Sequence, residues 1–97
     1  MHVKDANIVV ENNTLIVSGK LNFSTVMTLW NESLPLIANY AALHFDLSRV
    51  TTANSAGLAL LLEWIKRAQH EKKSITFDHV PAQLRSIATV SGIDKML

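Results

Sequence analysis

A strand, a turn and a helix follow one another without interruption between Leu43 and Glu71. Apolar and polar residues alternate over residues 42–47, which is the pattern of a strand with one buried face. After a turn at residues 48–57, apolar residues recur at helical spacing and share one face; they are Leu58, Leu61, Leu62, Ile65 and Ala68. A strand that leads into an amphipathic helix indicates an α/β domain, in which the helix packs on a sheet.

Two β-rich runs, residues 8–11 and 14–18, precede this unit. Asn12 and Asn13 separate them, and asparagine tolerates the positive φ angles of a tight hairpin turn. Gly19 is expected to end the second strand. These residues therefore predict an N-terminal β-hairpin.

A first helix is predicted to begin near Ser24, with Ser24 or Asn22 as its N-cap. Its apolar face carries Val26, Leu29, Trp30 and Ile37. Pro35 leaves the end of this helix open, because an interior proline removes a hydrogen bond and kinks the chain.

Beyond the central helix, Ser74–Phe77 is predicted as a short strand. Pro81 is expected to open a third helix, where its missing N–H costs nothing, and Gly92 to stop it. The core face of that helix carries Leu84, Ile87 and Ala88. The predicted order is β-β-α-β-α-β-α, an α/β fold with helices packed on a sheet. No repeat or linker divides the 97 residues, so we expect one domain, residues 1–97.

The composition argues against several classes of function. The formal net charge is +1 and Lys and Arg do not gather into a large cluster, which does not fit a nucleic-acid-binding surface. The chain has no cysteine, so disulfide scaffolds and thiolate metal sites are excluded. The polar N-terminus does not resemble a signal peptide, and the longest strongly apolar run, Ala56–Leu62, is far below the ~20 residues that span a bilayer. We therefore expect a cytoplasmic protein without membrane insertion.

The residues also give little support for catalysis or cofactor binding. The four histidines are His2, His44, His70 and His79, and their spacing is not that of metal ligands. Ser55, Asp46 and His44 or His79 supply the residue types of a catalytic triad, but a triad is defined by geometry, and Ser55 is not in a G-x-S-x-G elbow. The chain has no glycine-rich phosphate-binding motif. We expect no catalytic residue, no metal site and no cofactor.

The turn at residues 48–57 presents free backbone N–H groups at the start of the central helix. Asn54 or Ser55 can act as an N-cap there, which stabilises a helix by ~1 kcal/mol. An exposed hydroxyl at the same place can instead accept a phosphate or contact another protein. The residues by themselves leave both interpretations open.

Leu60 and Trp64 lie off the core face of the central helix. An apolar pair in that position can form a docking patch for a partner. The alternative is that Trp64 packs under a neighbouring helix and Leu60 is a singly exposed leucine.

The residues around this turn resemble a known family. Residues 46–48 (Asp-Leu-Ser), followed after a short turn by residues 54–58 (Asn-Ser-Ala-Gly-Leu), are similar to the signature of STAS domains, the fold of bacterial anti-sigma factor antagonists. The predicted element order agrees with that fold. The resemblance covers essentially the whole chain and implies a small mixed β-sheet of about four strands with helices packed on it.

Two branches of that family differ at the position of Ser55. In anti-sigma factor antagonists the matching serine is phosphorylated by a partner kinase, which controls partner exchange. In the MlaB branch, the small STAS subunits of Mla phospholipid-transport ABC systems, a threonine matches, and the subunit binds the cytoplasmic ATPase. Residues 18–21, residues 57–62 and the pair Leu29-Trp30 are similar to the MlaB branch. Asn54 replaces the aspartate typical of the kinase-regulated branch.

The resemblance implies a non-enzymatic STAS subunit that binds an MlaF-like ABC transporter ATPase. Such a transporter moves phospholipid and maintains outer-membrane lipid asymmetry, and the subunit would sit at the inner membrane only through its partner. The expected contact residues are Thr51, Thr52, Ala53, Asn54, Ser55, Ala56, Gly57, Leu60 and Trp64. The alternative is an anti-sigma factor antagonist-like regulator, switched by phosphorylation of Ser55 and partnered by a kinase and an anti-sigma factor.

Overall fold

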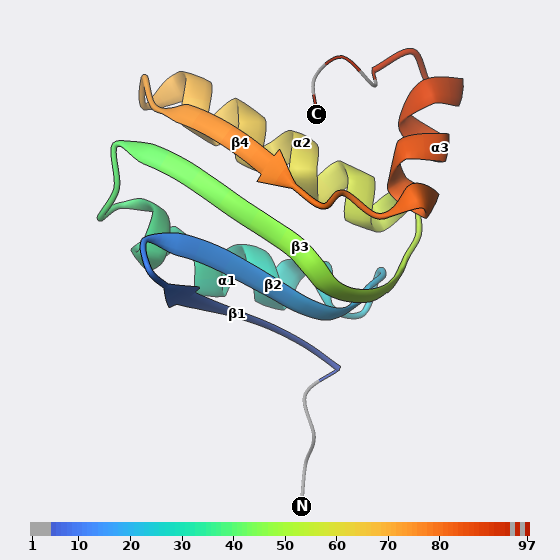
Figure 1. Ribbon diagram of the computed structural model, residues 1–97, viewed down its shortest axis with the longest axis horizontal. Helices are drawn as coiled ribbons and strands as arrows, with labels where there is room; N and C mark the ends of the chain where they lie inside the picture. The colour runs from blue at the N-terminus through green and yellow to red at the C-terminus, as the bar shows by residue number, and fades with distance from the viewer. Residues whose placement is uncertain (1–4, 94, 96) are drawn as a thin grey trace, which may run out of the picture.

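The computed structural model describes residues 5–93, 95 and 97. The elements, in chain order, are β1 (Ala6–Glu11), β2 (Thr14–Leu21), α1 (Val26–Ile37), β3 (Ala42–Ala53), α2 (Ser55–His70), β4 (Ser74–Asp78) and α3 (Ala82–Val90) (Figure 1). The predicted order β-β-α-β-α-β-α is confirmed.

The four strands form one mixed sheet in the order β1-β2-β3-β4. β1 and β2 are antiparallel, and Asn12 and Asn13 turn between them with φ angles of 52° and 61°. β3 is parallel to both β2 and β4, so α1 and α2 are the crossover connections. Both helices cover the same face of the sheet, and α3 lies at its end beside the start of α2 (Figure 1). The mixed four-stranded sheet expected for the fold is therefore confirmed.

The core lies between this sheet and the two crossover helices. Leu43, Phe45 and Leu47 alternate along β3 and are at most 1% exposed, while His44 and Asp46 lie on the other, helix-free face. Trp64 of α2 stacks on Phe45, with ring centroids 4.4 Å apart. This layering explains why apolar and polar residues alternate along the strand.

The second strand is longer than predicted, because Gly19 lies inside β2 and does not end it. Its φ angle is +91°, and a Cβ at this position would lie 2.1 Å from the carbonyl oxygen of Asp5. Glycine therefore permits a left-handed kink with close backbone approach. The register with β3 shifts on both sides of the kink, and pairing then continues to Leu21 opposite Ala53.

The first helix also begins differently from the prediction. Its N-cap position is Thr25, not Ser24 or Asn22. Asn22 Oδ1 accepts a hydrogen bond from Ser24 N at 2.9 Å, and Thr25 Oγ1 donates to Lys20 O at 2.7 Å. These bonds build a compact turn before the helix, and Pro35 lies inside the last turn without ending the helix.

The third helix ends as predicted but starts one residue later. Pro81 is its N-cap residue, and Ala82 is its first residue. At its other end Gly92 has a φ angle of +75°, and Ile93 N donates to Ala88 O at 2.9 Å. This is the left-handed stop that the glycine predicted.

Candidate functional site

The start of α2 is capped by Asn54, the single residue between β3 and the helix. Its Oδ1 accepts a hydrogen bond from Ala56 N at 2.9 Å, and its own N–H donates to Leu21 O at 3.1 Å. Ser55 is exposed, and its hydroxyl makes no hydrogen bond within the described part of the chain. The cap is therefore Asn54, and the Ser55 hydroxyl is available for another contact.

The preceding residues are strand, not turn. β3 extends to Ala53 and α2 begins at Ser55, so the predicted turn over residues 48–57 is wrong except at Asn54, the one residue outside a strand or helix. Thr52 pairs with Lys20 across the sheet, and both Thr51 and Thr52 are exposed. This pairing depends on β2, which is distant in sequence, and that is why local pattern did not reveal it.

Two other expected contact residues serve close packing. Gly57 is buried, and a Cβ there would lie 2.9 Å from Leu21 Cβ and 3.4 Å from Leu84 Cδ2. The absence of a side chain lets α2 approach both β2 and α3. Ala56 is 4% exposed beside it.

The expectation that Trp64 offers an exposed docking patch is wrong. Its side chain is fully buried, and its Nε1 donates to Ser33 Oγ of α1 at 2.9 Å. Ser33 Oγ in turn donates to Trp30 O at 2.7 Å, so the buried polar atoms are satisfied. The flank of α2 that looked free in sequence is the flank on which α1 packs.

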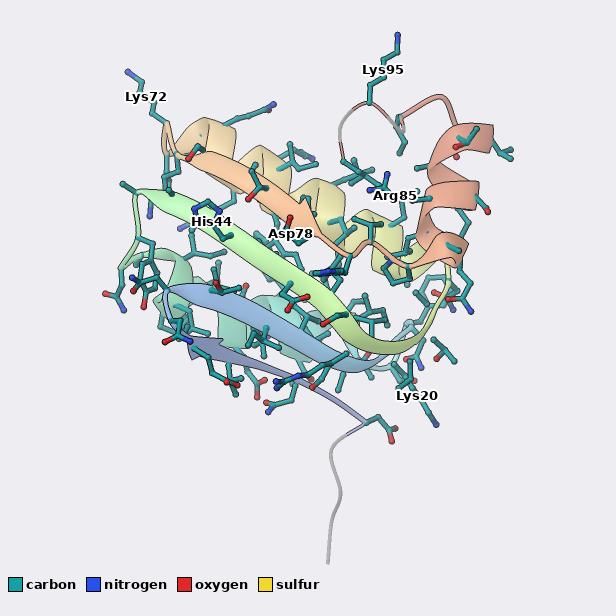
Figure 2. The ribbon with its side chains drawn as sticks, in the orientation of Figure 1. Lys20, His44, Lys72, Asp78, Arg85 and Lys95 are labelled. Atoms are coloured by element: carbon teal, nitrogen blue, oxygen red, sulfur yellow. The ribbon has the colours of Figure 1, made fainter. Side chains whose placement is uncertain are left out.

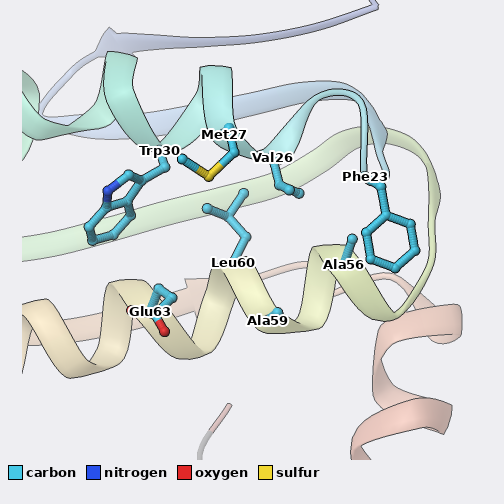
Figure 3. A pocket seen from close by; sticks show the side chains of 8 residues that line it. All are labelled: Phe23, Val26, Met27, Trp30, Ala56, Ala59, Leu60 and Glu63. Carbon is cyan, nitrogen blue, oxygen red and sulfur yellow. The ribbon is translucent and has the colours of Figure 1, made fainter.

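An open groove lies between the N-terminal halves of α1 and α2 (Figure 3). Its volume is about 440 Å³. The lining residues are Phe23, Val26, Met27, Trp30, Ala56, Ala59, Leu60 and Glu63. Leu60 is only 4% exposed and lies between the two helices, whereas Phe23 and Met27 stand on the rim at 77% and 64% exposure.

The groove combines two stripes with the same spacing. One wall comes from residues 23, 26, 27 and 30, and the other from residues 56, 59, 60 and 63. Ala56 and Ala59 are small, which leaves the hollow that larger side chains would fill. Sequence reasoning missed Phe23, Met27 and Ala59, although the shared spacing of three, four and seven residues was a readable signal.

Glu63 is the single ionisable side chain among the eight lining residues. Its Oε1 lies 3.3 Å from Lys66 Nζ, and both side chains are more than half exposed. An exposed pair of this kind contributes ~0–1 kcal/mol, so it holds Glu63 only weakly.

The trio considered for catalysis is not assembled. Asp46 lies on the helix-free face, where its Oδ1 accepts from Ser48 N at 2.9 Å and contacts His79 Nδ1 at 3.2 Å. The backbone hydrogen bond from Ser48, assisted by His79, lowers the pKa of the Asp46 carboxyl. Ser55 starts α2, which covers the opposite face of the sheet.

His44 Nδ1 lies 2.8 Å from Thr76 Oγ1 on the same helix-free face, from which His44 and Asp78 project (Figure 2). Over residues 5–93, 95 and 97, no three His, Asp or Glu side chains are placed to hold a metal ion. Nor does any helix in that part of the chain have the length and apolar character needed to cross a membrane.

Comparison with known proteins agrees with this architecture. A family model described as "Mlab, STAS domain" matches residues 6–97. MlaB of Escherichia coli K12, named an intermembrane phospholipid transport system binding protein, is 30% identical over 81 residues, which cover 84% of this chain and 81% of that protein. MlaB of Haemophilus influenzae is 25% identical over 84 residues, covering 82% and 80%.

Solved structures show the same fold at lower identity. An anti-sigma factor antagonist from Mycobacterium paratuberculosis superposes with a TM-score of 0.73 at 22% identity, over 95% of this chain and 80% of that one. Unphosphorylated SpoIIAA, also an anti-sigma factor antagonist, gives 0.70 at 15% identity, over 93% and 83%. The family match over almost the whole chain, together with this fold, shows that the chain belongs to the MlaB family of STAS-domain proteins.

Proposed function

We propose that this chain is a non-catalytic STAS subunit that binds the cytoplasmic ATPase of an Mla-type phospholipid-transport ABC transporter. The observation that carries the proposal is the apolar groove between α1 and α2, open beside the exposed Ser55 hydroxyl. The relatives named as phospholipid transport system binding proteins supply the class of partner. In this proposal the chain reaches the inner membrane only through that partner.

The groove has the properties of a protein-docking surface. Exposed apolar side chains that stand together, as Phe23 and Met27 do, mark an interaction site more often than scattered ones. Complete burial of one such side chain stabilises a complex by ~1.5–3 kcal/mol. An aromatic or aliphatic anchor from a partner would find the buried Leu60 at the bottom of the hollow.

The polar margin of the proposed surface lies at the start of α2. Ser55 is exposed there, Thr51 and Thr52 are exposed in the preceding strand β3, and Phe23 lies beside Ala56 at this end of the groove (Figure 3). In this proposal their hydroxyl groups form part of the polar rim that a typical interface has around its apolar centre. The proposed contact surface therefore keeps these three residues and Leu60, and it replaces Trp64 with Phe23, Met27 and Trp30.

The proposed mechanism is a rigid surface that favours one state of the ATPase. The groove walls are helices fixed on a sheet, so the walls are preorganised before binding. Such a subunit changes the ATPase equilibrium only by the difference in its affinity for the two states. In this proposal it favours the ATPase state that is assembled in the transporter. It thereby supports phospholipid transport and outer-membrane lipid asymmetry.

A second candidate, a switch operated by phosphorylation of Ser55, is favoured by one observation. Because Asn54 provides the cap, the Ser55 hydroxyl is free and accessible at a helix N-terminus with no acidic residue in its first turn. A phosphate there would be stabilised by the helix dipole and would add charge beside the groove. Intact-mass measurement of protein from its native cell tests this candidate. It predicts the added mass of a phosphate in the wild type and the loss of that mass in Ser55→Ala.

The main proposal is tested by binding between this chain and the Mla-type ATPase subunit of the same organism. Ala59→Trp places a large ring in the groove from an exposed position, so we expect loss of co-purification while the domain stays folded. Ser55→Glu should also weaken binding, because it puts charge on the rim. The control is Val90→Ser, which changes an exposed apolar residue of α3 outside the groove. Undiminished binding by Ala59→Trp would exclude the groove.

A further inference from the structure

The groove is chemically different at its two ends. Phe23 lies at the end near the start of α2, and Glu63 lies at the other end beside Trp30 (Figure 3). The Glu63 carboxylate is the one charge among otherwise apolar or aromatic lining side chains. A segment that fills the groove must therefore meet an anion at one end.

The ion pair with Lys66 stabilises the Glu63 carboxylate only weakly. Lys66 lies one turn along the same helix, its Nζ 3.3 Å from Glu63 Oε1, and the two side chains are 68% and 54% exposed. When a partner covers the groove, the carboxylate loses part of its water. A charge that loses water without gaining a good counterion opposes binding.

We propose that the ATPase segment which fills the groove carries apolar side chains and, next to them, a Lys or Arg that pairs with Glu63. This inference rests on the proposed docking function of the groove. The cation takes over the carboxylate from Lys66, and the apolar side chains lie over Leu60 and Ala59. An arginine suits the position well, because its guanidinium binds a carboxylate with two parallel hydrogen bonds.

The two members of the present ion pair give opposite predictions. Glu63→Gln removes the partner of the cation, and we expect a Kd about fivefold higher at low salt. Lys66→Gln removes the competitor for Glu63, and we expect a Kd about two- to threefold lower. Both effects should shrink as salt is raised, because these charges are near the surface. Titration calorimetry with the ATPase subunit at two salt concentrations measures both.

Two further variants keep the inference separate from the docking proposal. Ala59→Trp tests the groove itself, and Asp78→Asn on the helix-free face controls for a change in net charge. If Ala59→Trp abolishes binding while Glu63→Gln and Lys66→Gln leave Kd unchanged, the groove docks an apolar segment without the cation. If Lys66→Gln weakens binding, the partner carries an anion and the inference is wrong.

Discussion

The two exposed sides of this small domain differ in what they leave unsatisfied. On the helix-free face the polar groups pair with one another: His44 with Thr76 at 2.8 Å, and Asp46 with His79 at 3.2 Å. On the helix side, the groove exposes apolar surface that no described residue covers. A partner gains little by displacing pairs that already exist, but it gains by covering apolar surface. This difference supports the proposal that a partner binds on the helix side.

The two tryptophans repeat this contrast within the helix layer. Trp64 is fully buried, with its ring on Phe45 and its Nε1 bonded to Ser33. Trp30 is partly buried and lines the groove. The same residue type is therefore a core residue on α2 and a wall of the candidate site on α1.

The largest expected effect is on stability, and it tests this contrast between the two tryptophans. Trp64→Ala removes the stacked ring and the N–H that donates to Ser33 Oγ, so we expect the free energy of unfolding to fall by ~3–5 kcal/mol. Trp30→Ala should cost clearly less, ~1–2 kcal/mol, because part of its surface is already in water. Urea denaturation of both variants measures the difference. Equal losses would contradict the assignment of Trp30 to the open groove.

A smaller effect on stability distinguishes the helix cap, Asn54, from the proposed contact residue, Ser55, at the start of α2. Asn54→Ala leaves Ala56 N without its acceptor, and we expect a loss of ~1 kcal/mol in stability. Ser55→Ala should leave stability within ~0.5 kcal/mol, because its exposed hydroxyl has no described partner to lose. Thermal unfolding of the two variants under one condition provides the comparison. A cost for Ser55→Ala equal to that of Asn54→Ala would reassign the cap.

The smallest effect concerns the helix-free face and its pH dependence. The pKa of Asp46 is lowered in the folded state, chiefly by the hydrogen bond from Ser48 N, so the ionised carboxylate stabilises the fold. That stabilisation is complete above the unfolded pKa of ~3.9 and is lost as pH falls through the lower folded value. Asp46→Asn should cost at most ~1 kcal/mol at pH 7 and flatten the acid limb of a stability–pH curve.

The same variant also tests whether the helix-free face takes part in binding. Asp46→Asn should bind the ATPase subunit like wild type, because the change lies on the side opposite the groove. Weakened binding with unchanged stability would mean that the helix-free face also contacts the partner.

Much of the fold followed from local pattern. The Asn12-Asn13 turn, the alternation along residues 42–47 and the helical stripe from Leu58 to Ala68 each depend on residues close in sequence. The motif at residues 54–58 also marked the start of α2, which Asn54 caps and where Ser55 is exposed. Capping and side-chain period are local physics, so a single sequence determines them.

Tertiary packing decided the rest. Strand β3 continues to Thr52 and Ala53 only because β2, kinked at Gly19, continues to pair with these two residues. Trp64 is buried and Leu60 lies inside a groove only because α1 packs along one flank of α2. A helical period shows which residues share a face, but whether that face is core, groove or open surface depends on what distant segments bring against it.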